Sequence, residues 1–361
     1  MHHTSAETQD LVPIPRPRPS PPPRPSQPDE QYELLRWVAE LYYLQQQGQA
    51  DIANLIGASV SKVSRLLAEA RRQGIVTIHV AASRVGESPF ERELAERLGL
   101  QAVYVAPARV ADASVASRAA ALMAARMLPR LLPMQGLVGL SGGYTVAQLA
   151  HSLEPLPGVD LTLVPLQGNW VEGGVHVHND QVCRDAAHSL QARALSLPAP
   201  MVFDRADTRD ALLRDRSIRP VTSRWSELDM AVVGVGPAPS VQGVDYLSVM
   251  GQLPDEVRSD LQEHGVVGDL CAHMFDAAGH FVEHEVSRRT LSISIDELRR
   301  VPRVVAVAGG LSKAISLLGA VRTGIPKVLI TDQLAAESLS SLVNGESNNH
   351  YAGGAEGFQR S

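Results

Sequence analysis

Gly136-Leu-Val-Gly-Leu-Ser-Gly-Gly-Tyr-Thr145 is the stretch that decides the fold of the longer part of the chain. An apolar run ends at Leu140, a Ser-Gly-Gly turn follows, and Tyr144 opens a segment of helical character. Glycines permit positive φ and close approach of a ligand to the backbone. The first amides of a helix direct free N–H groups and a positive dipole end at an anion. The loop therefore predicts an anion-binding turn, although a tight turn without a ligand fits the same residues.

Length and composition limit what this loop belongs to. The chain has 361 residues, which predicts two or three domains, and its hydrophobic content of 44% with only 4% aromatics predicts aliphatic cores. Cys183 and Cys271 give neither a disulfide framework nor a metal-ligand spacing. Since no long apolar run or signal-peptide core is present, we expect a cytoplasmic protein without a membrane partner. The net charge of −6 restricts DNA binding to a local surface.

Two terminal segments are expected to be disordered tails, residues 1–30 and residues 346–361. In the first, prolines alternate with arginines, which removes backbone donors and leaves no apolar core. Its arginines are able to contact DNA phosphate, but a solvated tail is the simpler interpretation.

The segment after the first tail predicts three helices and a strand. Apolar spacing from Gln31 to Gln47 indicates the first helix, and Ala50 to Ile56 the second. Ser59 is a suitable N-cap for a third helix that extends to about Gln73. Ile75 to Val80 alternates as a strand does, which predicts a wing.

The third predicted helix has an apolar and a polar face. Its apolar side follows i, i+3, i+4, i+7 spacing through Val63, Leu66, Leu67 and Ala70. The opposite side is short, polar and basic, as a recognition helix in the major groove requires, and Arg65 is placed to reach guanine or phosphate. The charged face of a small three-helix interaction domain fits the same pattern.

Motifs in this segment resemble those of a known family. The run Gln49-Ala-Asp-Ile-Ala-Asn-Leu-Ile-Gly-Ala-Ser-Val-Ser-Lys-Val-Ser-Arg-Leu-Leu-Ala-Glu-Ala-Arg-Arg-Gln-Gly-Ile-Val76 resembles the winged helix-turn-helix of the SorC/DeoR family of sugar-responsive bacterial transcription regulators. The resemblance implies a winged helix-turn-helix, mainly α, over residues 31–82, with double-stranded operator DNA as partner. Together with the cap residue Ser59, it assigns these residues to the DNA-facing surface: Gln49, Ser59, Ser61, Lys62, Ser64 and Arg65.

Residues 83–345 predict an α/β domain with a parallel sheet, because continuous apolar runs alternate with helical segments. The expected strands are 102–106, 137–140, 161–166, a short one through 195–197, 230–235, 270–275, 304–308 and 328–331. The expected helices are 90–98, 113–132 with a break at Pro129, 144–153, 180–194, 311–322 and 333–343. Ligands bind past the carboxyl ends of parallel strands. Loops at Ser141, Gln167, Gly236, Asp269 and Gly309-Gly310 are therefore expected on one rim.

The family resemblance continues through this domain, from about Gln31 to Leu342 in all. It includes Gly234-Val-Gly236, Gly268-Asp-Leu-Cys-Ala-His-Met-Phe-Asp276 and Val307-Ala-Gly-Gly-Leu-Ser-Lys-Ala314. The resemblance implies a Rossmann-like sugar-phosphate-binding domain of the ribose-5-phosphate isomerase/glucosamine-6-phosphate deaminase type. In that family the glycine loop and a lysine after the late Gly-Gly hold the phosphate, which correspond here to residues 141–145 and Lys313.

Composition also singles out Lys313. The chain has only three lysines, and its other basic residues are arginines. Lys313 lies in the first turn of a predicted helix, where a cation opposes the helix dipole unless an anion shares the site; a surface lysine is the alternative. The predicted effector-binding residues are Ser141, Gly142, Gly143, Tyr144, Thr145, Gln167, Gly236, Asp269 and Lys313.

Enzyme and metal chemistry fit the sequence less well. An isomerase or deaminase needs a carboxylate or histidine poised for proton transfer, and Asp269 is the one rim carboxylate to consider. His176 and His178 have no evident third ligand, so a loop or edge strand is favoured over a metal site. No catalytic residue, metal or cofactor is assigned.

The predicted function is a DNA-binding transcription regulator, expected to be a repressor of carbohydrate catabolism genes. A phosphorylated sugar or polyol is the expected effector, and symmetric half-sites predict a homodimer or homotetramer. Two alternatives remain: a phosphosugar isomerase or deaminase with a fused helical module, and a protein-interaction adaptor with an empty pocket.

Overall fold

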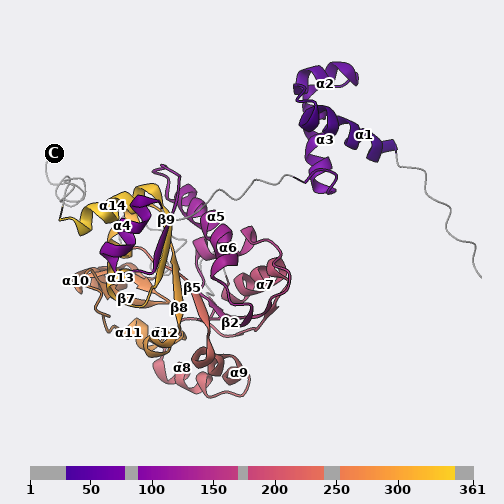
Figure 1. Cartoon of the computed structure of the whole chain (residues 1–361). Helices are drawn as coiled ribbons and strands as arrows, with labels where there is room; N and C mark the ends of the chain where they lie inside the picture. The colour runs from indigo at the N-terminus through magenta and orange to yellow at the C-terminus, as the bar shows by residue number, and fades with distance from the viewer. Residues whose placement is uncertain (1–29, 78–87, 170–177, 240–252, 346–361) are drawn as a thin grey trace, which may run out of the picture. The chain divides into compact units, whose positions relative to one another are not determined.

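The computed structural model describes residues 30–77, 88–169, 178–239 and 253–345 (Figure 1). The chain divides into two compact units, Met1–Arg84 and Val85–Ser361. The predicted tails lie outside the described residues, apart from Glu30, and so does His176.

The first unit is a bundle of three helices. They are α1 (Glu30–Ala39), continued by a π-helical turn η1 (Glu40–Leu44), then α2 (Gln49–Leu55) and α3 (Val60–Arg72). Val38, Ile52 and Val63, one from each helix, are fully buried in its core. Spacing thus predicted all three helices.

Two details of the first unit differ from the prediction. The first helix ends at Leu44 rather than Gln47, because Gln46 adopts a left-handed φ of 56° that no helix tolerates. Ile75 and Val76 form a bend and Thr77 has no regular structure, while residues 78–80 lie outside the described part of the chain. No strand is therefore present over residues 75–77, and the wing itself stays a prediction.

The second unit is organised around a seven-stranded parallel sheet. Its strands stand in the order β1-β9-β8-β5-β2-β3-β4, and each observed pairing is parallel. Their bounds are β1 Ala102–Ala106, β2 Gln135–Leu140, β3 Asp160–Pro165, β4 Arg193–Ala194, β5 Met230–Gly234, β8 Arg303–Val307 and β9 Val328–Asp332. The predicted α/β class with a parallel sheet is confirmed.

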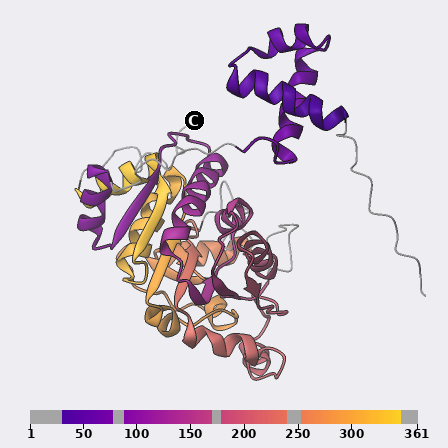
Figure 2. The same cartoon turned by 45° about the vertical axis from the view of Figure 1, so that its right-hand side comes forward.

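Helices cover both faces of this sheet, as both views of the cartoon show (Figures 1 and 2). One face packs against α5 (Ala113–Leu131), α6 (Tyr144–Ser152) and α7 (Asn179–Leu190). The other packs against α4 (Pro89–Leu98), α13 (Ala314–Arg322) and α14 (Gln333–Val343). Burial on both faces explains why the strands are continuous apolar runs.

Smaller elements surround the sheet, and most were not predicted. The helical ones are α8 Ala206–Leu213, α9 Arg219–Thr222, η2 Ser223–Glu227, α10 Asp255–Glu263, α11 Glu285–Arg288, α12 Ile295–Arg300 and η4 Leu311–Lys313. An antiparallel hairpin, β6 Val266–Leu270 with β7 His273–Asp276, forms a sheet of its own.

Four predictions in the second unit are wrong. The strand expected over 270–275 is interrupted, because Cys271 and Ala272 both adopt positive φ and turn the chain into the hairpin. The helix expected to reach Ala194 ends at Leu190, where Gln191 is left-handed, and the strand expected at 195–197 is instead β4. Pro129 does not break α5, which continues through it to Leu131.

The order of the strands reverses between β2 and β5. From β2 the chain proceeds through β3 to β4 on one side, whereas β5, β8 and β9 follow one another on the other side. Such a reversal leaves a crevice at the carboxyl ends of the two strands, where the following loops separate.

Candidate functional site

The loops after β2 and β5 meet at this reversal of strand order. The Gly234 N–H donates to Ser141 Oγ at 2.9 Å, and the Ser141 N–H donates to the Val232 carbonyl at 3.0 Å. Ser141 is buried, so its hydroxyl fixes the two loops to each other. We call the loops after β2, β3, β5 and β8 the rim.

The glycine loop on the rim opens directly onto a helix end. Gly143 is the N-cap of α6 with φ 100°, and among the described residues no side-chain cap of this helix is present. A Cβ at Gly143 would meet nothing within 4 Å, so the loop is open on that side. Uncapped amides at a helix N-terminus bind anions. Thr145 is buried in the first turn of α6, and Tyr144 is half-buried.

A second group of predicted residues gathers after β5. The Gly236 N–H donates to the Asp269 carbonyl at 3.0 Å, and a Cβ on Gly236 would lie 1.7 Å from Asp269 Oδ1. Lys313 Nζ donates to the Val235 carbonyl at 3.1 Å. Asp269 reaches the rim from the β6–β7 hairpin rather than from a parallel strand. Asp269 lies beside Gly236 and near Lys313, as predicted. The structural element that carries it there is a hairpin and not a strand of the parallel sheet.

Asp269 is a buried acid with incomplete hydrogen bonding. Its Oδ2 accepts from the Ala272 N–H at 3.0 Å, whereas its Oδ1 has no hydrogen-bond partner among the described residues. Burial raises the pKa of Asp269 to about 6, although the Ala272 amide and the Lys313 charge act in the opposite direction. The carboxyl group therefore exchanges its proton close to neutral pH.

A carboxamide pair lies beneath the glycine loop. Gln167 follows β3, as predicted, and Asn179 opens α7. A Cβ on Gly142 would lie 2.1 Å from Asn179 Oδ1 and 3.4 Å from Gln167 Nε2. Sequence reasoning missed Asn179. Its only signal was the position of an asparagine at the start of a helix, where a capping role is the ordinary interpretation.

The late Gly309-Gly310 pair serves packing. A Cβ on Gly309 would lie 2.4 Å from the Ala116 carbonyl oxygen, so only glycine lets this loop rest on the start of α5. The Gly310 N–H donates to Asp332 Oδ2 at 2.6 Å, while Asp332 Oδ1 caps α14. These contacts hold the short helix η4, and with it Lys313, at the rim.

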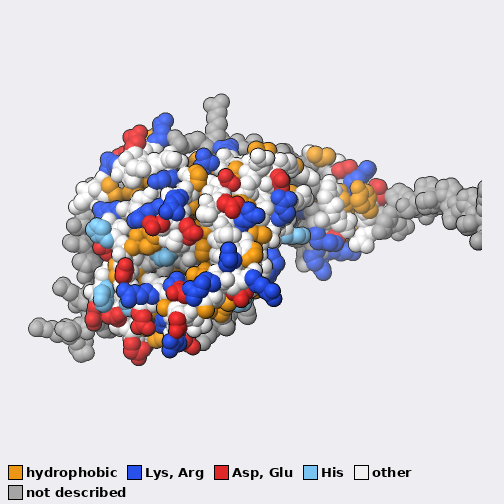
Figure 3. Space-filling view, turned by 90° about the horizontal axis from the view of Figure 1, so that it is seen from below, with side chains coloured by type: hydrophobic (Ala, Val, Ile, Leu, Met, Phe, Trp, Pro, Cys, Tyr) orange, Lys and Arg blue, Asp and Glu red, His pale blue; other side chains and the backbone are white. Residues whose placement is uncertain are grey.

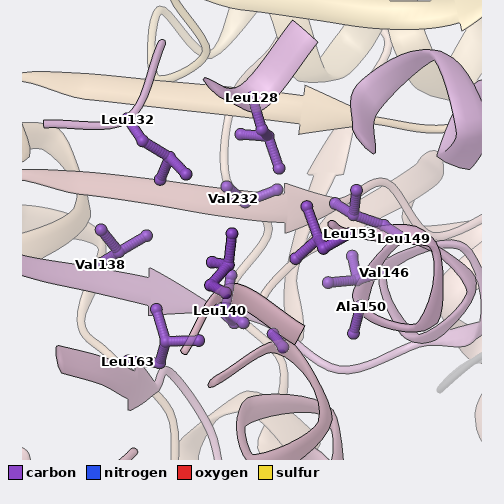
Figure 4. A pocket seen from close by; sticks show the side chains of 12 residues that line it. Leu128, Leu132, Val138, Leu140, Val146, Leu149, Ala150, Leu153, Leu163 and Val232 are labelled. Carbon is purple, nitrogen blue, oxygen red and sulfur yellow. The ribbon is translucent and has the colours of Figure 1, made fainter. Parts of the chain in front are cut away.

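The second unit also contains a small apolar cavity that is separate from the rim site (Figure 4). It measures about 10 Å³ and lies between α5, α6, α7 and the sheet. Its lining is Leu128, Leu132, Val138, Leu140, Val146, Leu149, Ala150, Leu153, Leu163, Ala186, Leu190 and Val232. Without a polar side chain it offers a sugar nothing to bind, so we interpret it as a packing void.

In the first unit, the predicted DNA-facing residues lie on the outside of α3. Ser61, Lys62, Ser64 and Arg65 are exposed, whereas Val63, Leu67 and Ala70 on the opposite side are buried. Gln49, the first residue of α2, is half-buried. The amphipathic prediction for α3 is confirmed, except that Leu66 is only partly buried.

The N-cap of α3 and two of its arginines differ in the hydrogen bonds they make. Ser59 Oγ accepts from the Lys62 N–H at 3.2 Å, which confirms Ser59 as the N-cap. Within the described part of the chain, Arg65 Nε donates only to the Ser61 carbonyl of its own helix, at 3.4 Å. Arg72, near the other end, is bound to Glu69 through both carboxylate oxygens. Arg65 is thus available for an outside partner, and Arg72 is already paired.

The second unit has no comparable basic face in the view of Figure 3. Basic and acidic side chains are interspersed over the part of its surface seen there. Such a mixture does not favour nucleic-acid phosphate. His178 is an exposed N-cap of α7, and the described residues hold no group of three or more His, Cys, Asp or Glu side chains placed to bind a metal ion. None of the described helices is both long and apolar enough to cross a membrane.

Comparison with known proteins places these features in a family. Residues 84–340 match the family model of a sugar-binding domain, Sugar-bind. The deoxyribonucleoside regulator of Bacillus subtilis is 28% identical over 310 residues, covering 86% of this chain and 98% of that protein. The sorbitol operon regulator of Klebsiella pneumoniae is 29% identical over 306 residues, covering 84% and 96%.

A solved structure extends the likeness to both units. The full-length sorbitol operon regulator SorC from Klebsiella pneumoniae superposes with a TM-score of 0.67 at 28% identity, covering 87% of this chain and 99% of that one. Since the family model spans most of the chain and these relatives are matched over nearly their whole length, the chain belongs to the SorC/DeoR family of sugar-binding transcription regulators.

Proposed function

We propose that this regulator is a repressor of carbohydrate catabolism genes whose operator affinity is set by a phosphorylated sugar or polyol bound at the rim. The observation that carries the proposal is the uncapped N-terminus of α6, which opens at the reversal of strand order between β2 and β5. Anions bind at helix N-termini, and ligands of parallel sheets bind at such reversals.

The charges around the rim support a phosphorylated ligand. The phosphate is proposed to bind the amides of Gly143 to Thr145, with Lys313 as the cation that neutralises it. Lys313 is held by the Val235 carbonyl next to the Ser141–Gly234 junction. The sugar hydroxyls are proposed to meet Gln167, Gly236 and Asp269. No cofactor is required for this role.

The finer features of the fold belong to the same proposal. We assign the first unit as a winged helix-turn-helix, with Gln49, Ser59, Ser61, Lys62, Ser64 and Arg65 facing DNA. We assign the second unit to the ribose-5-phosphate isomerase/glucosamine-6-phosphate deaminase type. A homodimer or homotetramer in the cytoplasm would read symmetric half-sites. The effector changes operator affinity only if the DNA-competent and DNA-incompetent states bind it unequally.

A thermal-shift screen against phosphorylated trioses, pentoses, hexoses and polyols tests the effector. Wild type is expected to be stabilised by at least one of them, and Lys313→Ala to lose that stabilisation. Lys327→Ala is the matched control, because Lys327 precedes β9 at the opposite end of the strands and donates to the Gly324 carbonyl. Equal stabilisation of Lys313→Ala and Lys327→Ala would remove Lys313 from the site.

A second candidate, a phosphosugar isomerase or deaminase, is favoured by one observation. Asp269 has a pKa raised to about 6 by burial and lies near Lys313, which suits general acid–base chemistry. We expect no enzymatic turnover, since the relatives that match this chain over nearly their whole length are named as regulators. Conversion of any sugar phosphate that the wild type loses on Asp269→Asn substitution would support the enzyme instead.

A further inference from the structure

The orientation of Asn179 is fixed by its donor atoms. Asn179 Nδ2 donates to the Gln167 carbonyl at 2.7 Å and to the Gly168 carbonyl at 3.3 Å. A flipped carboxamide would place its oxygen against these two carbonyl oxygens, so the assignment of the two atoms is unambiguous. Asn179 Oδ1 must therefore point the other way, toward Gly142 on the glycine loop.

This oxygen is buried without a hydrogen bond. Asn179 is 2% exposed, and its Oδ1 finds no donor among the described residues. Gln167 beside it is 5% exposed, and its Oε1 is also without a donor there. Among the described residues, the Gln167 amide nitrogen donates only to the Met201 sulfur, at 3.3 Å, which is a weak acceptor. Buried polar atoms in proteins are rarely left unpaired, so unpaired acceptors on these two hydrogen-bonded residues indicate a ligand.

We propose that Asn179 Oδ1 and Gln167 Oε1 form a subsite for ligand hydroxyl groups. It accepts hydrogen bonds from hydroxyls on the first and second carbons beyond the carbon that bears the phosphate. The inference rests on the proposed function, since the phosphate on α6 places those carbons beside Gly142. It names the effector class more narrowly, as a polyol phosphate or sugar phosphate with hydroxyls adjacent to its phosphate-bearing carbon.

Access to the subsite requires the glycine loop to rearrange. Gly142 lies directly over Asn179 Oδ1, and a side chain at this position would collide with it. Gly142 and Gly143 in sequence make peptide rotation easy, because neither has a Cβ that limits φ. When the loop moves, Asn179 Oδ1 loses its contact with Gly142, and ligand hydroxyls are able to donate hydrogen bonds to the two carboxamide oxygens.

Two ligands of equal carbon number test the subsite directly. sn-Glycerol 3-phosphate carries hydroxyls on both carbons in question, and n-propyl phosphate carries none. By isothermal titration calorimetry, the wild-type protein is expected to bind glycerol phosphate at least about tenfold more tightly than propyl phosphate, because each buried acceptor left unpaired weakens binding. This comparison needs no variant and is insensitive to folding defects.

A variant assigns the preference to the carboxamides. Gln167→Met has nearly the same shape and removes Oε1, so the ratio of the two affinities is expected to fall several-fold toward one. Gln181→Met, on the exposed side of α7, is the matched control and is expected to keep the wild-type ratio.

The outcomes separate the inference from the function on which it rests. If wild type binds sugar phosphates but treats the two probes equally, or if Gln167→Met keeps the wild-type ratio, the hydroxyl subsite is wrong and the phosphate site stands. If neither probe nor any sugar phosphate of the thermal-shift screen binds, the proposed function fails as well.

Discussion

The outer face of α3 and the rim of the sheet satisfy their polar groups in opposite ways. On α3, the side chains of Ser61, Lys62, Ser64 and Arg65 are exposed to water. On the rim, buried oxygens of Gln167, Asn179 and Asp269 have no hydrogen-bond partner among the described residues. Water satisfies an exposed polar group, but a buried one needs a fixed partner. The polar groups of α3 therefore have water as their partner, whereas these three rim oxygens have no partner among the described residues.

The largest effect is expected from Asp269→Asn, which removes the least satisfied charge of the rim. The pKa of Asp269 is about 6 in the folded protein, against about 3.9 for an unfolded aspartate. The folded state thus holds more protons between these values, so wild-type stability falls as pH rises from about 4 to 6. The total loss is about 3 kcal/mol, which Asp269→Asn is expected to avoid.

Urea unfolding at pH 4 and pH 8 measures most of this difference, with the ligand absent. The exposed Asp296 on α12 provides a control, since Asp296→Asn changes the net charge equally without altering a buried group. If wild type and Asp269→Asn lost stability equally between the two pH values, the rim would not hold a destabilising carboxylate.

On α3, Arg65→Ala is expected to weaken operator binding by about 1–3 kcal/mol, the usual range for one base contact. Arg72→Ala on the same helix should have a smaller effect, because Arg72 is already bound to Glu69. A gel-shift titration at one fixed salt concentration compares the two variants. Comparable losses would show that charge alone, and not the position on the helix, determines binding.

The smallest effect concerns the cap of α3. Ser59→Ala removes the acceptor for the Lys62 amide and is expected to destabilise the first unit by about 1 kcal/mol. Ser59→Asp preserves a cap but adds a negative charge, so it should retain the melting temperature and weaken DNA binding. Should Ser59→Asp bind the operator like wild type, Ser59 serves only the helix and not the DNA contact.

Local sequence patterns predicted the helices and strands whose conformation is determined by residues close in sequence. The strand at 102–106 and the helix at 333–343 were predicted to the residue, since both are unbroken apolar or amphipathic runs. The rim residues Ser141, Gln167 and Gly236 were predicted because each follows an apolar strand. Comparison with relatives confirmed the regulator family, while the individual site residues remain predictions.

Long-range geometry accounts for what the sequence did not predict. Leu270 to Phe275 is apolar throughout, and nothing local announces the positive φ of Cys271 and Ala272 that turns it into a hairpin. Asn179 was missed because its importance depends on carbonyls eleven and twelve residues earlier, and on the glycine loop opposite. Sequence spacing cannot place an oxygen beneath a loop.

The apolar cavity beside α6 makes the packing of this helix sensitive to hydrostatic pressure. Val146, Leu149 and Ala150 line the void, and the same helix bears the glycine loop at its first turn. Voids make a folded state compressible, and hydrostatic pressure favours arrangements in which they disappear. Helix α6 therefore both lines the void and carries the proposed anion site, which makes pressure a physical means of perturbing the rim without touching its side chains.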